Sequence, residues 1–401
     1  MQLQLWDNNK ISRISFEDLL QAYFQCRSNK RNTANALKFE LVYEQNLLQL
    51  LDEINTGKYM PGRSIAFIID KPVKREIFAA DFRDRIVHHL IIQKLNPIFE
   101  QKFIYDSYSC RKGKGTHFGI NRVDRFIRRC SSNYRKDCYV LKLDIKGFFM
   151  HINRKILYKK LHRFILDNYH HSDKAKILEL TNKIVFNDPK ENCIIKGGKD
   201  RWKDLPESKS LFHSKDNCGL PIGNLTSQVF ANFYMDSFDH FVKHDLKIKY
   251  YGRYVDDFVI VYQDKEYLKS LVPLLSNFLL STLKLTIHPK KIYLQHYSKG
   301  VKFIGGVIKP HRIYIANRTK GNLYASIDKH NEIARDHKPT KEEKQAFMSS
   351  MNSYLGIMKH YKTYNIRKTM LKENISGWWE NYFTIGNRYE KLEKKQKILK
   401  Q

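Results

Sequence analysis

The feature that most constrains this chain is a pair of adjacent acids, Asp256 and Asp257, set between two runs of strand-forming residues. The runs Ile248–Tyr254 and Phe258–Tyr262 are rich in aromatic and β-branched side chains, which favour strands. The polar break between them predicts a β-hairpin with both acids at its turn. Adjacent carboxylates repel one another, and burying them costs free energy unless a positive partner is close. The pair alone leaves two interpretations open: an ordinary surface turn and a cation site.

A second predicted strand ends in another acid, because the apolar run that begins at Val140 leads directly to Asp144. Magnesium prefers oxygen ligands and is often held by one or two carboxylates together with substrate phosphates. A two-metal site for phosphoryl transfer needs carboxylates from separate strands that converge on ions about 4 Å apart. We therefore predict that Asp144, Asp256 and Asp257 are the catalytic and metal-binding residues, with Asp257 engaged more loosely.

At these motifs the chain resembles the catalytic palm of reverse transcriptases, since Tyr254-Val-Asp-Asp follows an Asp144-Ile-Lys-Gly-Phe-Phe strand. The segment between them, Gly219-Leu-Pro-Ile-Gly-Asn-Leu-Thr-Ser-Gln228, is similar to the Ile-Gly-x-x-x-Ser-Gln signature of diversity-generating retroelement enzymes. Group II intron enzymes usually carry Gln-Gly-x-x-x-Ser-Pro there, so the motif favours the retroelement branch. The resemblance runs through about residues 60–310 in the family's order, and it adds Ile145 to the metal-binding set.

The resemblance implies an α+β fold, a right-hand polymerase with fingers, a palm whose antiparallel sheet packs on helices, and a helical thumb. Helical spacing of apolar residues near both ends of the chain agrees with this organisation. The expected domains are an N-terminal helical extension over residues 1–60, fingers over 61–139, a palm over 140–310 with an insertion at about 188–217, and a helical thumb over 311–401. The last residues of the thumb, 391–401, are expected to form a basic, frayed end.

The resemblance also implies which cations meet the triphosphate of the incoming nucleotide. Arg75, on a strand-turn-strand segment of the fingers, is the first candidate, assisted by Lys71 or Lys74. A later palm lysine, Lys290 or Lys291, is expected to approach the same phosphates, and the sequence does not rank these two.

Aromatic rings after the first acid suggest how the sugar is selected. A bulky ring under the nucleotide sugar would clash with a 2′-hydroxyl and so favour deoxynucleotides. By resemblance Phe149 is the first candidate for this ring and Phe148 the second. Ile222 and Gln228 are expected beside the nascent base pair, where their identity is associated with errors opposite template adenine.

Two further segments are expected to hold template and primer. The loop at residues 105–117 combines cations with glycines, which let a backbone approach phosphates closely. The segment at residues 301–308 predicts a short strand pair around a Gly-Gly turn, similar to a primer grip. The candidates are Arg111, Lys112 and Lys114 in the first segment and Phe303, Gly305 and Gly306 in the second.

Charge and cysteine usage bound the partners and the compartment. The chain has 72 Lys and Arg against 41 Asp and Glu, a formal charge of +31 spread along its length, which favours a polyanionic partner. No apolar run approaches the length of a membrane span, so no membrane partner is expected. The 6 cysteines lack metal-site spacing and are expected to be reduced thiols of a cytoplasmic protein.

The function implied by the resemblance is RNA-directed DNA polymerisation with two magnesium ions, for which manganese can substitute. The expected substrates and partners are dNTPs, a template-repeat RNA, the cDNA/RNA duplex and a small basic pentameric accessory protein. The product would be adenine-mutagenic cDNA for mutagenic retrohoming by a bacterial or phage-encoded retroelement. The alternatives are a reverse transcriptase of an antiphage defence, retron or group II intron-like system, and a non-catalytic RNA-binding scaffold.

Overall fold

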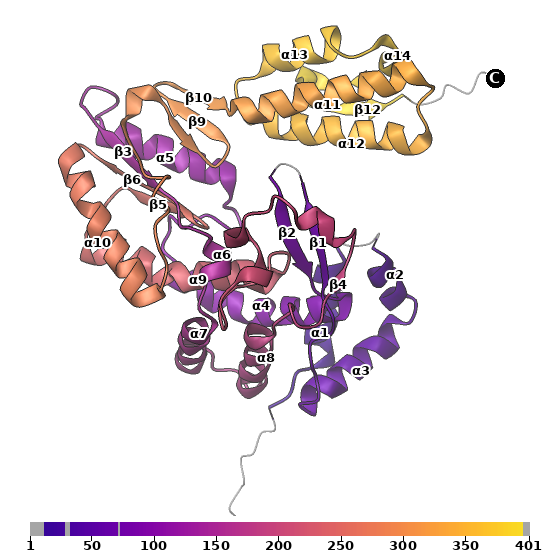
Figure 1. Ribbon diagram of the computed structural model, residues 1–401, viewed down its shortest axis with the longest axis vertical. Helices are drawn as coiled ribbons and strands as arrows, with labels where there is room; N and C mark the ends of the chain where they lie inside the picture. Colours follow the sequence, from indigo (N-terminus) through magenta and orange to yellow (C-terminus); the bar gives the residue numbers. More distant parts are fainter. Residues whose placement is uncertain (1–11, 29–32, 71–72, 396–401) are drawn as a thin grey trace, which may run out of the picture. The chain divides into compact units, whose positions relative to one another are not determined.

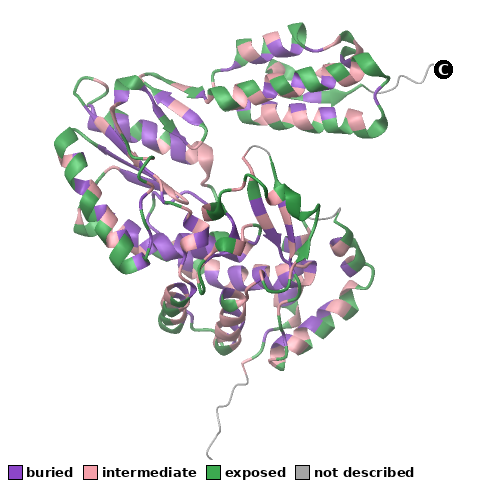
Figure 2. Ribbon diagram, viewed as in Figure 1, coloured by how far each residue is buried: buried purple, intermediate pink, exposed green. Residues whose placement is uncertain are grey.

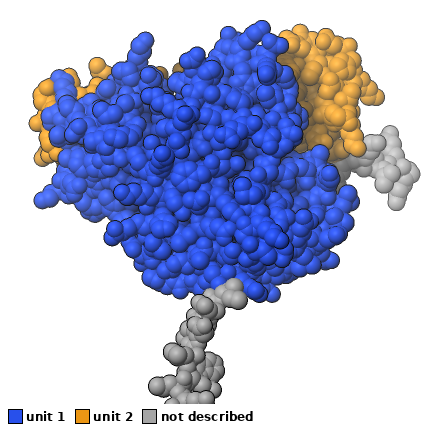
Figure 3. All heavy atoms as spheres, turned by 60° about the horizontal axis from the view of Figure 1, so that its bottom comes forward, with its two compact units in different colours: residues 1–113, 142–258, 269–292 blue, residues 114–141, 259–268, 293–401 orange. Residues whose placement is uncertain are grey.

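The computed structural model describes residues 12–28, 33–70 and 73–395, and the chain divides into two units. Unit 1, blue in Figure 3, comprises residues 1–113, 142–258 and 269–292, and unit 2 comprises residues 114–141, 259–268 and 293–401. Each unit draws on segments expected to form both fingers and palm. Among the described residues, no helix has both the length and the apolar character that crossing a membrane requires.

The N-terminal part of unit 1 is helical, as predicted. Ser15 begins the first helix, because its hydroxyl accepts a hydrogen bond from the Asp18 amide at 3.1 Å. Among the described residues before 60, the structure has three helices. Asp81 caps the next long helix in the same way by accepting from the Arg83 amide at 3.1 Å. These helices are α1 (Phe16–Arg27), α2 (Ala34–Glu40), α3 (Tyr43–Asn55) and α4 (Phe82–Lys102).

The core of unit 1 is built around α9 (Leu225–His240), which is buried along most of its length (Figure 2). Figure 1 shows α4 beside α9, and both α4 and α7 pack on it. Aromatic side chains fill the junction, where the rings of Phe99 and Phe233 lie 5.0 Å apart. The other helices of this unit are α6 (Phe148–His151), α7 (Arg154–Asn168) and α8 (Lys174–Phe186), while α10 (Lys265–Leu283) belongs to both units.

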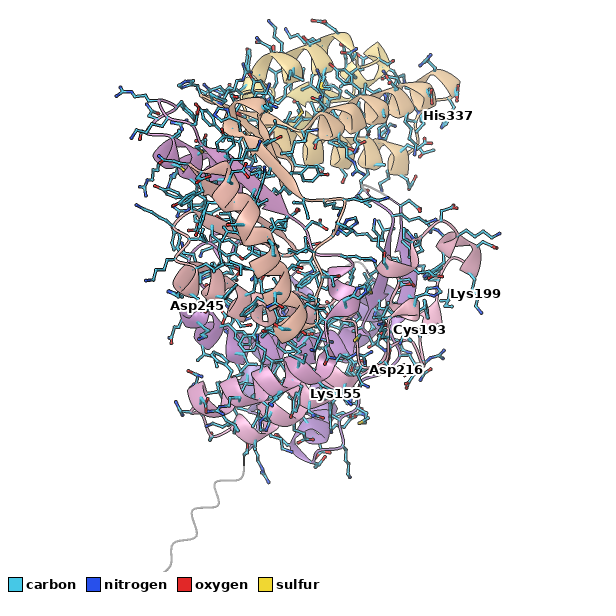
Figure 4. All side chains as sticks on the ribbon, turned by 60° about the vertical axis from the view of Figure 1, so that its left-hand side comes forward. Lys155, Cys193, Lys199, Asp216, Asp245 and His337 are labelled. Carbon is cyan, nitrogen blue, oxygen red and sulfur yellow. The ribbon has the colours of Figure 1, made fainter. Side chains whose placement is uncertain are left out.

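Two short strands of unit 1 form the hairpin predicted for the fingers, and a third strand joins them from the insertion. β1 (Ile65–Ile69) and β2 (Arg75–Ala79) pair antiparallel, with Ile65 opposite Ala79. β4 (Ile194–Ile195) pairs parallel to β1, so the order is β2-β1-β4. The insertion, residues 188–217, is marked in Figure 4 by Cys193, Lys199 and Asp216. It therefore completes a sheet whose other strands lie over a hundred residues earlier.

A buried acid on β2 fastens the insertion to this sheet. The Glu76 side chain, in a residue only 1% exposed, accepts hydrogen bonds from the Trp202 indole and the Ser210 hydroxyl, both at 2.7 Å. The Leu211 amide donates to its second oxygen at 2.5 Å. A buried carboxylate needs such donors, and here all three come from the insertion.

Replacing Glu76 with alanine is expected to destabilise the protein by about 3 kcal/mol, because three donors, two of them buried, would lose their acceptor. The insertion should also become sensitive to limited proteolysis before the rest of the protein unfolds. Chemical denaturation and mass spectrometry of the first cleavage products measure both effects. Glu191→Ala, which changes an exposed acid of the same segment, is the control, and equal stability of the two variants would contradict the role given to Glu76.

The predicted acidic hairpin is confirmed. β5 (Tyr251–Tyr254) and β6 (Asp257–Tyr262) are neighbours in a four-stranded sheet of order β5-β6-β3-β7. In this sheet β3 (Tyr139–Leu143) is the strand that leads to Asp144, and β7 is Tyr293–His296. The sheet order therefore brings together the two strand ends that carry the predicted catalytic acids.

In unit 2, α5 (Thr116–Cys130) packs on a three-stranded sheet of order β10-β9-β8. β8 (Val301–Phe303) and β9 (Gly306–Lys309) form the predicted hairpin, but its turn is Ile304-Gly305 rather than Gly-Gly. Gly306 lies against Ile120 so closely that a Cβ would come within 2.9 Å of its side chain. The third strand, β10 (Arg312–Ile315), was not predicted.

The C-terminal part of unit 2 is the predicted helical segment, in which the helices break between Asp336 and Lys341. Its core includes Phe347 and Trp379, whose stacked rings lie 4.1 Å apart. The prediction of a frayed basic end was wrong for the residues before 396, because Leu392 is buried and its strand pairs with the preceding one. The elements are α11 (Asn317–Asp336), α12 (Lys341–Met358), α13 (Tyr364–Glu373), α14 (Gly377–Glu380), β11 (Phe383–Ile385) and β12 (Leu392–Lys394).

Candidate active site

The acidic turn between β5 and β6 holds two of the three predicted catalytic residues. Asp256 lies in the turn and Asp257 begins β6, and both side chains are half-buried. Val255, just before them, has a φ of +57°, in the left-handed region. A β-branched residue is strained there, and strain of this kind gathers at functional sites. The turn is therefore held in a conformation that its own sequence does not favour.

The third acid, Asp144, follows β3 and is fixed through its backbone. Its carbonyl accepts from the His288 amide at 2.8 Å, and the Lys146 amide donates to the Thr286 carbonyl at 2.9 Å. These bonds flank an antiparallel bridge between Ile145 and Ile287. The segment after β3 is thus tied to residues 286–288. Ile145 itself is buried beside the acid, and its metal-binding role stays a prediction.

Two lysines neutralise the outer pair of acids. The Lys291 ammonium lies 2.8 Å from Asp144 Oδ2, and the Lys142 ammonium lies 3.0 Å from Asp257 Oδ1. Lys291 is thus the palm lysine that reaches the site, whereas Lys290 is exposed. Sequence reasoning missed Lys142, although it precedes Asp144 by two residues and strand periodicity places the two on one face.

The pKa of Asp256, the central acid, is affected by both neighbouring acids. Burial, then the charges of Asp257 and Asp144, raise the pKa of Asp256 to about 7. Such a shift arises when a carboxyl group is removed from water beside other carboxylates. The three predicted residues are therefore gathered at one place, from the ends of two neighbouring strands.

The donor set fits a hard divalent cation. Carboxylate oxygens are the ligands that magnesium uses in phosphoryl-transfer sites, and the crowding at Asp256 is what such a cation would relieve. Within residues 12–28, 33–70 and 73–395, however, no three His, Cys, Asp or Glu side chains are arranged to hold a metal ion. Two of the three acids are paired with lysines, Asp257 with Lys142 and Asp144 with Lys291. A bound cation would replace the lysines as the positive partner.

Magnesium affinity is expected to weaken as the pH falls below about 7. The cation binds the ionised form of Asp256, whereas protons bind the same group with a pKa of about 7. Below that pH the proton competes, and affinity should fall by up to about tenfold per pH unit. Calorimetric titration at about pH 6 and about pH 8 tests this expectation. Equal affinity at both values, without proton release on binding, would contradict it.

The fingers residues expected at the triphosphate are only partly free to act there. Arg75 is exposed at the start of β2. Burial and the Cys110 thiol raise the pKa of Tyr254, while the positive charge of Arg75 opposes that rise, so Arg75 lies near the acidic hairpin. The Lys74 ammonium donates to the carbonyl of Lys203 in the insertion. Lys71 lies outside the described residues.

The two aromatic candidates differ in exposure. Phe148 is 3% exposed and belongs to the core, whereas Phe149 is half-buried, with the two rings 5.4 Å apart. Phe149 and Ile222 pack against the same small cluster, which includes Phe78 of β2. The Ile222 carbonyl accepts from the Phe78 amide at 2.8 Å. The structure thus brings together Phe149, Ile222 and the fingers hairpin.

Gln228 lies exposed in the first turns of α9, where its side-chain oxygen accepts a hydrogen bond from the Cys110 thiol at 3.1 Å. Gly223, between the two signature residues, has a φ of +125° and lies so close to β2 that a Cβ would come within 2.8 Å of Ile77. The loop of the signature is thus fitted against the fingers hairpin.

The three candidates for template binding differ in their exposure and contacts. Arg111 turns into the protein, where its guanidinium pairs with Glu100 at 2.8 Å and donates to the Ile104 carbonyl at 2.6 Å. A satisfied, buried guanidinium is poorly placed to follow phosphates, and this corrects the expectation for Arg111. Lys112 of the same loop is exposed. Lys114, which belongs to unit 2, lies half-buried above the Phe118 ring at 5.9 Å.

The primer-grip candidates are in unit 2, in the β8–β9 hairpin. Phe303 is buried, so its ring serves the core of that unit rather than a surface. Gly305 forms the turn with a φ of +94°, and nothing lies within 4 Å of the position that its Cβ would take. Gly306 faces Ile120 instead. Of the three, Gly305 has open space around it.

This chain is similar in sequence to a known protein family and to two known proteins. Residues 70–308 match the family model described as "Reverse transcriptase (RNA-dependent DNA polymerase)". Protein YkfC of Escherichia coli (strain K12) is 23% identical over 306 residues, which covers 67% of this chain and 72% of that protein. A putative COX1/OXI3 intron 1 protein of Saccharomyces cerevisiae is 24% identical over 253 residues, or 62% of this chain and 27% of that protein.

Among solved structures, apo telomerase from Candida tropicalis matches with a TM-score of 0.49 at 12% identity, over 82% of this chain and 63% of that chain. Telomerase from Candida albicans, solved with a fragment of telomeric RNA, gives a TM-score of 0.45 at 12% identity, over 84% of this chain and 63% of that chain. The present chain thus spans less than two thirds of the telomerases and of the yeast protein.

Proposed function

This chain belongs to the reverse transcriptase family of RNA-dependent DNA polymerases, and we propose that it copies an RNA template into DNA at Asp144, Asp256 and Asp257. The observation that carries the proposal is the gathering of these three acids within the matched region, with Asp256 raised to a pKa of about 7 by burial and by its two neighbours. An ordinary surface turn has no reason to collect a third carboxylate from another strand.

Each residue of the site has its own role in the proposed reaction. Asp144 and Asp256 would hold the cations, and Asp257 would assist from its place beside Lys142. Bound magnesium supplies the charge that activates a primer 3′-hydroxyl and stabilises the leaving pyrophosphate. Once released from Asp144, the Lys291 ammonium is positioned to neutralise the triphosphate. Arg75 would bind the same phosphates from the fingers hairpin.

We further propose that the enzyme belongs to the retroelement branch, with error-prone copying opposite adenine. The support is the Ile222-to-Gln228 signature and its place against β2. This proposal implies a template-repeat RNA as template, a small basic pentameric accessory protein as partner, and the cytoplasm of a bacterial or phage-infected cell as location. The competing proposal is a group II intron-like enzyme, which the likeness to a yeast intron protein favours.

Sequencing the cDNA made from a heteropolymeric RNA template separates these proposals. With a DNA primer, magnesium and all four dNTPs, the retroelement proposal expects substitutions concentrated opposite template adenines. Equal substitution rates opposite all four template bases would favour the intron-like or defence alternatives. Failure to extend the primer on any RNA template, with either magnesium or manganese, would favour a non-catalytic scaffold.

A further inference from the structure

An arginine lies fully buried directly under the acidic turn. Arg253 of β5 is 0% exposed and stands three residues before Asp256. Its guanidinium makes a two-pronged ion pair with Asp239 of α9, from Nε to Oδ1 at 2.7 Å and from Nη2 to Oδ2 at 2.6 Å. The Tyr251 hydroxyl donates to the same carboxylate at 2.5 Å. Paired forks of this kind fix the guanidinium in orientation as well as in place.

The remaining donors of this guanidinium reach three different parts of the chain, and the longest of these contacts runs from Nη2 to the Ser107 hydroxyl at 3.5 Å. Nη1 donates to the carbonyl of Val255 at 2.8 Å and to the side-chain oxygen of Asn232 at 3.1 Å. Nη2 also lies 3.3 Å from the Asn232 backbone carbonyl. One planar group therefore joins α9 to the peptide that immediately precedes Asp256. Both α9 and β5 belong to unit 1, and Figure 1 shows them close together.

The bond to Val255 falls on the strained residue of the turn. Val255 has its φ at +57°, a conformation that a β-branched residue leaves unless its surroundings hold it. Its carbonyl oxygen is the atom that accepts the hydrogen bond from Arg253. Rotation of this residue toward an ordinary strand conformation would break that hydrogen bond and swing the Asp256 backbone with it.

We propose that Arg253 is a positioning residue for the polymerase reaction: locked on α9 by Asp239, it holds the Val255–Asp256 peptide so that the Asp256 carboxylate faces Asp144 and can share a divalent cation with it. This inference rests on the proposed function, because it assigns a task within the same site. A buried ion pair that serves folding alone would need no bond to the turn.

Arg253→Lys tests the proposal. Lysine keeps the positive charge opposite Asp239, but its single nitrogen cannot serve Asp239, Asn232 and Val255 together. The Kd for Mn²⁺, measured by electron paramagnetic resonance without substrates, is expected to rise by about tenfold. The kcat for primer extension should fall by about 10²-fold, the scale of a misplaced catalytic group, while the KM for primer-template stays unchanged.

Arg154→Lys is the matched control. Arg154 is 4% exposed, pairs with Asp188 at 2.7 Å and donates to the Cys218 carbonyl at 3.2 Å, so it is a buried, ion-paired arginine of the same unit. It should lose a similar amount of thermal stability without a change in the Kd for Mn²⁺. An unchanged Kd in Arg253→Lys, at a stability equal to that of the control, would overturn the proposal.

Two further variants keep the outcome decisive. Adding Val255→Gly to Arg253→Lys should recover part of the Mn²⁺ affinity, because glycine adopts a positive φ without strain; further loss of affinity would count against the proposal. If Arg253→Lys does not fold, Asp239→Asn tests the proposal instead, because it keeps the arginine but weakens the ion pair that fixes it. An unchanged Kd for Mn²⁺ in Asp239→Asn would overturn the proposal. A wild-type protein without any polymerase activity would instead refute the proposed function, whatever Arg253 does.

Discussion

Replacing Asp256 with asparagine is expected to lower the rate of primer extension by about 10³-fold or more while the protein remains folded. Loss of a carboxylate that holds the reacting cations removes about 4 kcal/mol of transition-state stabilisation. Asparagine has the shape of the protonated acid, and burial with two acidic neighbours already raises the pKa of Asp256 to about 7. Neutralising this position therefore relieves repulsion that the metal-free protein otherwise bears.

The same variant should consequently be as stable as the wild type, or more stable, above about pH 7. The sign follows from linkage: an acid whose pKa is raised on folding stabilises the protein when protonated, and that stabilisation is lost as the pH rises through about 7. Single-turnover extension on an RNA template and thermal unfolding at about pH 8 give the two readouts. Asp200→Asn, at an exposed acid of the insertion, should change neither, and wild-type polymerase activity in Asp256→Asn would refute the site.

Replacing Phe149 with alanine is expected to let the enzyme incorporate ribonucleotides about 10 to 10²-fold more readily relative to dNTPs, because the ring that excludes a 2′-hydroxyl is removed. Phe149 is half-buried and packs beside Ile222 and the fingers hairpin, where a nucleotide sugar could meet it. The ratio of kcat/KM for dNTP and rNTP, measured with the same primer and template, gives the effect.

Phe148→Ala separates the two candidates of the pair. That ring is 3% exposed, so its removal should create a cavity and cost about 3 to 5 kcal/mol of stability. Sugar selectivity should stay close to that of the wild type. If Phe148→Ala shifted the ratio and Phe149→Ala did not, the order assigned to the two rings would have to be reversed.

The acids and their strands could be predicted from the sequence because the signal is local. Alternation and β-branched residues mark the strands, and Asp144, Asp256 and Asp257 stand at their ends. The order of the four-stranded sheet, which brings these ends together, came only with the structure. Lys142 escaped notice because a lysine on a strand usually indicates a solvent-exposed position.

Other residues could not be assigned because their partners lie on separate helices that meet them only in the folded chain. Nothing near Arg253 indicates that Asp239 will meet it inside the protein. Arg111 stands in a glycine-rich basic loop, a pattern that suggests phosphate binding, yet Glu100 at the end of α4 takes its guanidinium. The strands β11 and β12 have only 3 residues each, too few for an alternating pattern to distinguish them from a loop.

The insertion has a consequence for how this protein is made. The ribosome synthesises Glu76 long before Trp202, Ser210 and Leu211, the residues whose side chains and backbone satisfy it in the finished sheet. A nascent chain that has emerged only as far as residue 190 therefore carries this acid without those donors, and the edge of β1 without β4. The first hairpin of the polypeptide can mature only after Leu211 has left the exit tunnel, which delays completion of the N-terminal part and favours late, concerted folding over domain-by-domain completion.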